Sequence, residues 1–115
     1  MAGKGSGVTK EQKQEYNNLK VENANNKLDS SKTYYDEVLE KKKKMETGKA
    51  EAEQRLAKAE ASGDTDAIEA AKQDIKAWEN ALDVVIEEAK SAEEAYLADW
   101  EAALSASREA FLANA

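Results

Sequence analysis

The sequence predicts an all-α protein, a long antiparallel two-helix hairpin of coiled-coil type that self-association or a partner completes to a bundle. Three observations predict this fold. The 115 residues include no proline and are rich in alanine, glutamate and lysine, which favour helices. Apolar residues recur three and four positions apart along two long segments. One strong break, Ser62-Gly63-Asp64, separates these segments near the middle of a chain long enough for one domain.

The first element expected is a helix over about residues 10–61, after a glycine-rich tail (residues 1–8) that we expect to be disordered. Thr9 and Gln12 have the spacing of a capping box, which places the start of the helix. Gly48 has no capping residue after it, so we expect the helix to continue through it. The apolar stripe of this helix consists of Val21, Ala24, Leu28, Tyr35, Val38, Met45, Ala52, Leu56 and Ala59.

The chain is expected to reverse over residues 62–65 and to form a second helix over about residues 66–113. Gly63 suits the left-handed residue that closes a helix, and Asp66 with Glu69 suits a new amino-terminal cap. The apolar residues of this helix cover an arc of about 120°, which is wider than a two-stranded seam and predicts more than one neighbouring helix. They are Ile68, Ala71, Ile75, Trp78, Leu82, Val85, Ile86, Ala89, Tyr96, Leu97, Trp100, Leu104 and Phe111.

Charge is divided unevenly between the two arms. Residues 1–62 contain 13 Lys and Arg against 11 Asp and Glu, whereas residues 63–115 contain 4 against 13. Opposite net charges favour pairing of the arms, and an acidic chain is a poor general binder of nucleic acid. We therefore expect a protein partner, and nucleic acid is an unlikely one.

The composition also limits the chemistry. Cysteine and histidine are absent, so thiol nucleophiles, imidazole bases and the usual zinc sites are excluded. Adjacent carboxylates such as Glu87 and Glu88 point about 100° apart on a helix and make no acid–base pair. We predict no enzymatic activity, no catalytic residue, no metal site and no cofactor.

No segment has the apolar length of a membrane span, and the first residues lack the apolar stretch of a classical signal peptide. The protein is therefore expected to be soluble, without a membrane span.

Two clusters are candidate binding sites. Four consecutive lysines, Lys41, Lys42, Lys43 and Lys44, could contact an anionic partner, although such a run is more often a solvated helix surface. Glu37 and Glu40 precede Lys41 and Lys44 by four residues, which suits ion pairs along the helix. The candidate interface is aromatic and apolar and comprises Trp78, Tyr96, Leu97, Trp100, Leu104, Phe111 and Leu112.

The end of the second helix poses an open choice. Its aromatic residues could pack on the first helix or form a docking surface. The segment expected to face them, residues 17–26, offers little apolar area because it contains five asparagines. The sequence leaves both alternatives open.

The length and hairpin layout resemble the small Trp-x-Gly helical hairpins that specialised secretion systems export. The turn here is Ser62-Gly63-Asp64 instead of Trp-x-Gly, and Tyr96 is followed four residues later by Trp100 instead of an acid. The sequence is therefore not assigned to that family. The resemblance implies one alternative, a small secreted helical-hairpin protein.

The function that the sequence favours is a non-enzymatic structural or assembly protein that acts through helix–helix packing. We expect a homo-oligomer or a subunit of a larger particle, with a virion-associated phage protein as one setting. A second alternative is an acidic regulatory module, an inhibitor or nucleic-acid mimic, that engages a basic protein surface.

Overall fold

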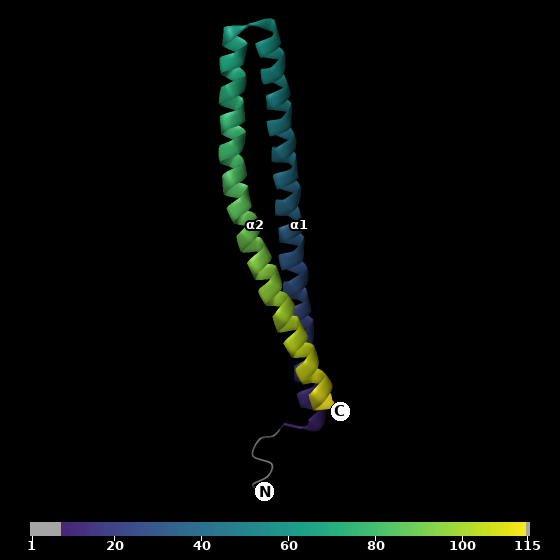
Figure 1. Cartoon of the computed structure of the whole chain (residues 1–115). Helices are drawn as coiled ribbons and strands as arrows, with labels where there is room; N and C mark the ends of the chain where they lie inside the picture. The colour runs from purple at the N-terminus through teal and green to yellow at the C-terminus, as the bar shows by residue number, and fades with distance from the viewer. Residues whose placement is uncertain (1–7, 115) are drawn as a thin grey trace. The chain divides into compact units, whose positions relative to one another are not determined.

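The computed structural model describes residues 8–114, and in this range it contains two long helices and no strand. Helix α1 spans Lys10–Ser62 and helix α2 spans Thr65–Asn114. The chain reverses between them, and α2 returns along α1 (Figure 1). The predicted all-α hairpin is confirmed. Most of the predicted tail, residues 1–7, lies outside the described residues.

Helix α1 begins with the predicted capping box. The amide of Gln12 donates to Oγ1 of Thr9 at 3.0 Å, and the amide of Thr9 donates to Oε1 of Gln12 at 2.9 Å. Two amides that the first turn would leave without acceptors are thereby satisfied.

The turn is closed by Gly63, whose φ of 72° is in the left-handed region, as predicted. The amide of Gly63 donates to the carbonyl of Ala59 at 3.0 Å, and the amide of Asp64 donates to the same carbonyl at 3.3 Å. Asp64, and not the predicted Asp66, caps α2, because its Oδ1 accepts from the amide of Ala67 at 3.1 Å. The cap lies two residues earlier because Gly63 alone completes the reversal.

Helix α1 continues through Gly48, and the structure gives a reason for a glycine there. A β-carbon at Gly48 would lie 2.6 Å from Cζ2 of Trp78 and within 2.8 Å of two further indole carbons. The indole therefore packs on the bare backbone of α1. A glycine costs about 1 kcal/mol in a helix interior, and here that cost allows a large ring to approach closely.

The chain divides into two compact units, which we describe separately. The turn unit is Tyr34–Glu93, and the terminal unit combines Met1–Thr33 with Glu94–Ala115. In both units the helices meet along a seam, which we define as the row of buried or partly buried residues at alternating steps of three and four on each helix. Such spacing is the 3.5-residue repeat of a left-handed coiled coil.

The seam of the turn unit contains the main core. Val38, Val85 and Ala92 are 2%, 1% and 2% exposed and form one cluster. Partly buried hydrophobic residues pack around this cluster, and they are Tyr35, Met45, Leu82 and Ala89. Nearer the turn, the buried seam residues are small; they are Ala52, Ala59 and Ala71.

The seam of the terminal unit is built differently. Its fully buried residues are alanines of α2: Ala103, Ala106 and Ala110 are 6%, 9% and 7% exposed. Alanine buries little apolar area per layer. The terminal unit therefore has a thinner core than the turn unit.

Candidate protein-docking surface

The bulky apolar side chains at the end of α2 lie on its solvent side. Leu97, Trp100, Leu104 and Phe111 are 49%, 46%, 44% and 74% exposed. We call these four residues the terminal stripe. They follow one another at steps of three, four and seven, so they form a second row with the same repeat as the seam.

Each residue of the terminal stripe follows a seam residue by one position. Leu104 follows buried Ala103, and Phe111 follows buried Ala110. A step of one residue turns a helix by about 100°. The stripe is therefore a separate face beside the seam, and the two rows together make up the broad apolar arc predicted for the second helix.

A groove between the helices of the terminal unit runs beside the stripe. It is lined from α1 by Val21, Glu22 and asparagines such as Asn25, and from α2 by residues that include Ser107 and Phe111. Trp100 and Leu104 also line a smaller hollow against Asn25 and Leu28. Apolar side chains at the centre with polar groups at the rim are the usual composition of a protein–protein interface.

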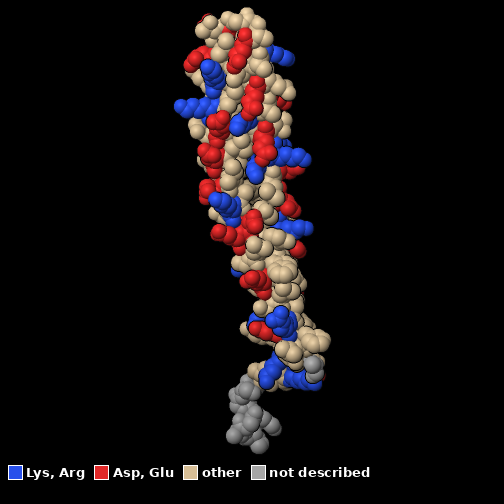
Figure 2. Space-filling model, in the orientation of Figure 1, with Lys and Arg blue, Asp and Glu red and all other residues tan. Residues whose placement is uncertain are grey.

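The surface view supports this assignment. In Figure 2 acidic and basic side chains crowd the surface of the turn unit, whereas toward the end of α2 they are fewer and uncharged surface is more extensive between them. Contiguous apolar surface on a protein commonly marks a site of interaction with another molecule.

Five of the seven predicted interface residues are exposed. They are the four residues of the terminal stripe and Leu112, which is 67% exposed and follows Phe111. Trp78 and Tyr96 are instead partly buried on the seam. Trp78 is held by the contact with Gly48 and belongs to the core of the turn unit.

A polar pair on the seam was not predicted. The hydroxyl of Ser31 donates to Oδ2 of Asp99, and both residues are partly buried. A polar layer in an otherwise apolar seam fixes the register of a helix pair, because a shifted register leaves its groups without partners. The 3.5-residue spacing from Leu28 to Ser31 and Tyr35 would have identified this position.

The four lysines of the candidate anion contact differ in their surroundings. Lys41 Nζ lies 3.4 Å from Glu88 Oε2 on α2, and Lys42 is a partly buried seam residue 3.8 Å from Glu46. Lys43 and Lys44 are exposed. In the described part of the chain, the expected ion pairs of Lys41 with Glu37 and of Lys44 with Glu40 are absent, and Lys41 pairs with Glu88 of the neighbouring helix instead.

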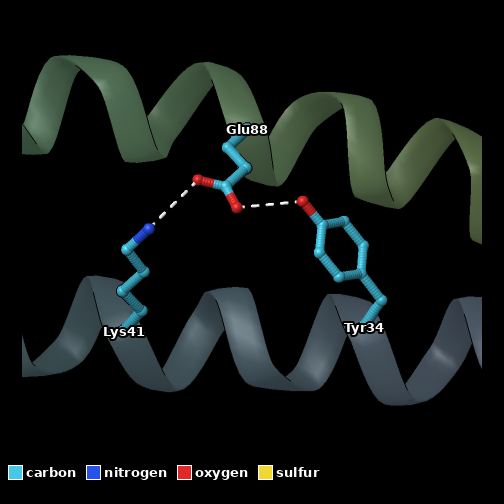
Figure 3. Close-up of polar contacts among 3 residues, drawn as sticks. All are labelled: Tyr34, Lys41 and Glu88. Carbon is cyan, nitrogen blue, oxygen red and sulfur yellow. Dashed lines mark hydrogen bonds and ion pairs between the residues drawn. The ribbon is translucent and has the colours of Figure 1, made fainter.

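Glu88 contacts Tyr34 as well as Lys41, as Figure 3 shows. The hydroxyl of Tyr34 donates to Oε1 of Glu88 at 2.9 Å, and this hydrogen bond to a carboxylate raises the pKa of Tyr34. The hydroxyl of Tyr35 donates to Glu93 at 3.2 Å. Burial is the main cause that raises the pKa of Tyr35, and the bond to Glu93 adds to it. Both tyrosines cross-link α1 and α2 in the turn unit.

Other carboxylates of the acidic second arm also face α1. Asp74 pairs with Arg55 at 3.5 Å, and Glu79 pairs with Lys49 at 3.8 Å. In the terminal unit, Glu109 pairs with Lys20 at 3.2 Å. The opposite charges of the arms are therefore used within the hairpin. Each exposed pair contributes little stability, about 0 to 1 kcal/mol.

No cluster of three or more potential metal-ligating side chains occurs in the part of the chain that the structure describes. Within the same range, neither helix contains a stretch that is apolar enough to cross a membrane. Compared with known proteins, the chain matches no protein-family model, no curated protein and no solved structure, so its function is argued from its own residues.

Proposed function

We propose that this protein is a non-enzymatic structural or assembly protein that binds a protein partner by helix packing through the terminal stripe. The expected setting is a subunit of a larger particle, such as a virion. One observation carries the proposal: four bulky apolar side chains of α2 in the terminal unit are 44% to 74% exposed, while the buried residues of its seam are alanines.

The physical argument is the placement of apolar area. Exchanging alanines on the seam for leucine or phenylalanine would bury more area inside the hairpin. The chain instead exposes about half of Trp100, Leu97 and Leu104 in a straight row. Aromatic residues in such a row are the anchors that dominate the binding energy of many interfaces.

The test compares the unmodified full chain with one double variant and one single control variant, each produced in the organism from which the chain comes. Trp100→Ser with Phe111→Ser removes both aromatic anchors of the stripe. Val84→Ser is the matched control, because Val84 is 69% exposed but belongs to the turn unit. Circular dichroism checks that all chains remain helical.

We expect the unmodified chain and the Val84→Ser control to sediment with a particle at a fixed ratio to its other components. The double variant should remain in the free pool. If all three chains stay free, or all three enter the particle equally, the proposal is wrong. Loss of binding by moderate salt alone would instead support an acidic module on a basic surface.

A further inference from the structure

We infer that the terminal stripe is occupied by a second copy of this chain, whose α2 runs antiparallel to the first. This inference rests on the proposed function and specifies the partner. It assigns two residues that the proposed function does not use, Glu101 and Arg108, as the pair that sets the direction of the partner helix.

The geometry of the stripe suits a helix. Leu97 to Phe111 covers about 21 Å at 1.5 Å per residue, or two heptads. Because the stripe has the same 3.5-residue repeat as the seam, it stays on one side of α2 along this length. Another helix can therefore lie along all four side chains, as it does in a bundle of more than two helices.

The charges beside the stripe identify the occupant. Glu101 and Arg108 are one heptad apart, so they lie on the same edge of the stripe, next to Trp100 and Leu104 on that face of α2. Both are exposed, and neither forms an ion pair within residues 8–114. The edge thus carries one acid and one base without partners.

Two copies related by a twofold axis near Leu104 satisfy these charges. The axis brings Glu101 of each copy beside Arg108 of the other, so two ion pairs form at once. It also brings Trp100 of each copy near Phe111 of the other, with Leu104 at the centre. A parallel arrangement would instead place Glu101 beside Glu101 and Arg108 beside Arg108, which repels.

The area of contact sets the expected strength. Stable complexes bury about 800 Å² on each partner, and a single pair of helices in contact over about 21 Å buries less. The dimer should therefore be reversible, and its mass should fall toward that of the monomer on dilution. The charge pair contributes more to the specificity of the dimer than to its affinity.

The test reverses each charge in the purified full chain and measures mass by sedimentation equilibrium over a range of concentrations. Glu101→Arg puts two arginines together at each end of the contact, and Arg108→Glu puts two glutamates together. We expect each single variant to associate roughly tenfold more weakly than the unmodified chain. Because both residues are exposed, circular dichroism should show unchanged helicity.

Two further samples test the charge contact, and the first of them decides the direction of the helices. The double variant, Glu101→Arg with Arg108→Glu, should regain the association of the unmodified chain. An equal mixture of the two single variants should form a heterodimer, because every contact then joins an arginine to a glutamate. A parallel pair would not regain association in the double variant, since its like-charged contacts stay like-charged there. The mixture joins opposite charges in either direction, so it tests the charge contact and not the direction.

The inference is overturned if the unmodified chain is a monomer at all concentrations, or if charge reversal has no effect on association. In that case the assembly role stands when Trp100→Ser with Phe111→Ser still prevents entry into the particle, and the stripe binds a different protein. If the chain forms the predicted dimer but all variants enter the particle equally, the assembly role fails instead. The two experiments therefore fail independently.

Discussion

The turn unit and the terminal unit contain the same two helices with the same repeat, yet they place their bulky side chains on different faces of α2. In the turn unit, Trp78, Leu82 and Val85 lie on the seam, where Val85 is 1% exposed. In the terminal unit, the buried seam residues are alanines, and Leu97, Trp100, Leu104 and Phe111 lie one position after seam residues and are exposed. The difference shows that the turn unit has the thicker core, and under the proposed function the terminal unit keeps its apolar area for a partner.

Truncating one leucine in each unit tests this comparison most directly. Leu82→Ala removes a side chain packed against the buried cluster, so we expect the free energy of unfolding to fall by about 2 kcal/mol. Leu104→Ala removes an exposed side chain and should change it by less than about 0.5 kcal/mol. Urea unfolding at concentrations where the chain is monomeric measures both. Equal losses would show that the two units are packed alike.

The second test concerns the contact between Gly48 and Trp78. Gly48→Ala forces the indole to move, at a cost of about 1 to 3 kcal/mol that the better helix propensity of alanine offsets by only about 1 kcal/mol. We expect a net loss of about 1 kcal/mol or more in thermal or urea unfolding.

Repeating the Gly48→Ala change in a chain without the indole of Trp78 separates the effect of ring packing from that of helix propensity. With Trp78→Leu in place, Gly48→Ala should stabilise the chain, because the ring no longer fills the space above the backbone. Ala50→Gly is the matched control, since Ala50 is exposed and the change should cost about 1 kcal/mol from propensity alone. A stabilising Gly48→Ala in the unmodified chain would disprove the role of the ring.

The third test concerns the polar layer of the terminal unit. Ser31→Ala leaves Asp99 partly buried without its donor, so the free energy of unfolding should fall by about 1 kcal/mol. Ser30→Ala is the matched control, because Ser30 is an exposed neighbour on the same helix and should have no measurable effect. If both substitutions changed the free energy of unfolding equally, the hydrogen bond of Ser31 to Asp99 would not stabilise the hairpin.

The smallest expected effect is a pH dependence confined to the turn unit. The pKa of Tyr34 is raised from 10.0 because its hydroxyl donates to Glu88, so the folded state holds the proton more tightly than the unfolded state. This stability is complete below pH 10 and is lost as pH rises through the raised pKa of the folded state. Denaturant unfolding against pH should show a smaller decline above pH 10 in Tyr34→Phe. Identical declines would contradict the assignment.

Local signals predicted much of the architecture. The box formed by Thr9 and Gln12 fixed the start of α1, and Gly63 marked the reversal, because each acts within one turn of the backbone. The second cap was misplaced by two residues, at Asp66 instead of Asp64. Both aspartates satisfy the pattern, and only the exact end of the turn distinguishes them.

The candidate site was predicted in part, and its residues show why. Leu97, Trp100, Leu104, Phe111 and Leu112 were identified by size and position, and the structure finds them exposed. Lys41 could not be paired correctly from the sequence, because its partner Glu88 is distant along the chain and belongs to the other helix. Contacts between helices depend on register, which composition and spacing constrain only loosely.

By itself, therefore, the sequence determined that the chain forms two long helices joined at Gly63, because helix propensity, capping and turn geometry are local properties. Only the tertiary structure decided which of two adjacent rows on α2 faces α1 in the terminal unit. The rows containing Ala103 and Leu104 are one residue apart and share the same repeat. Close contact with the neighbouring helix selects the row of alanines, and the larger side chains are left facing solvent.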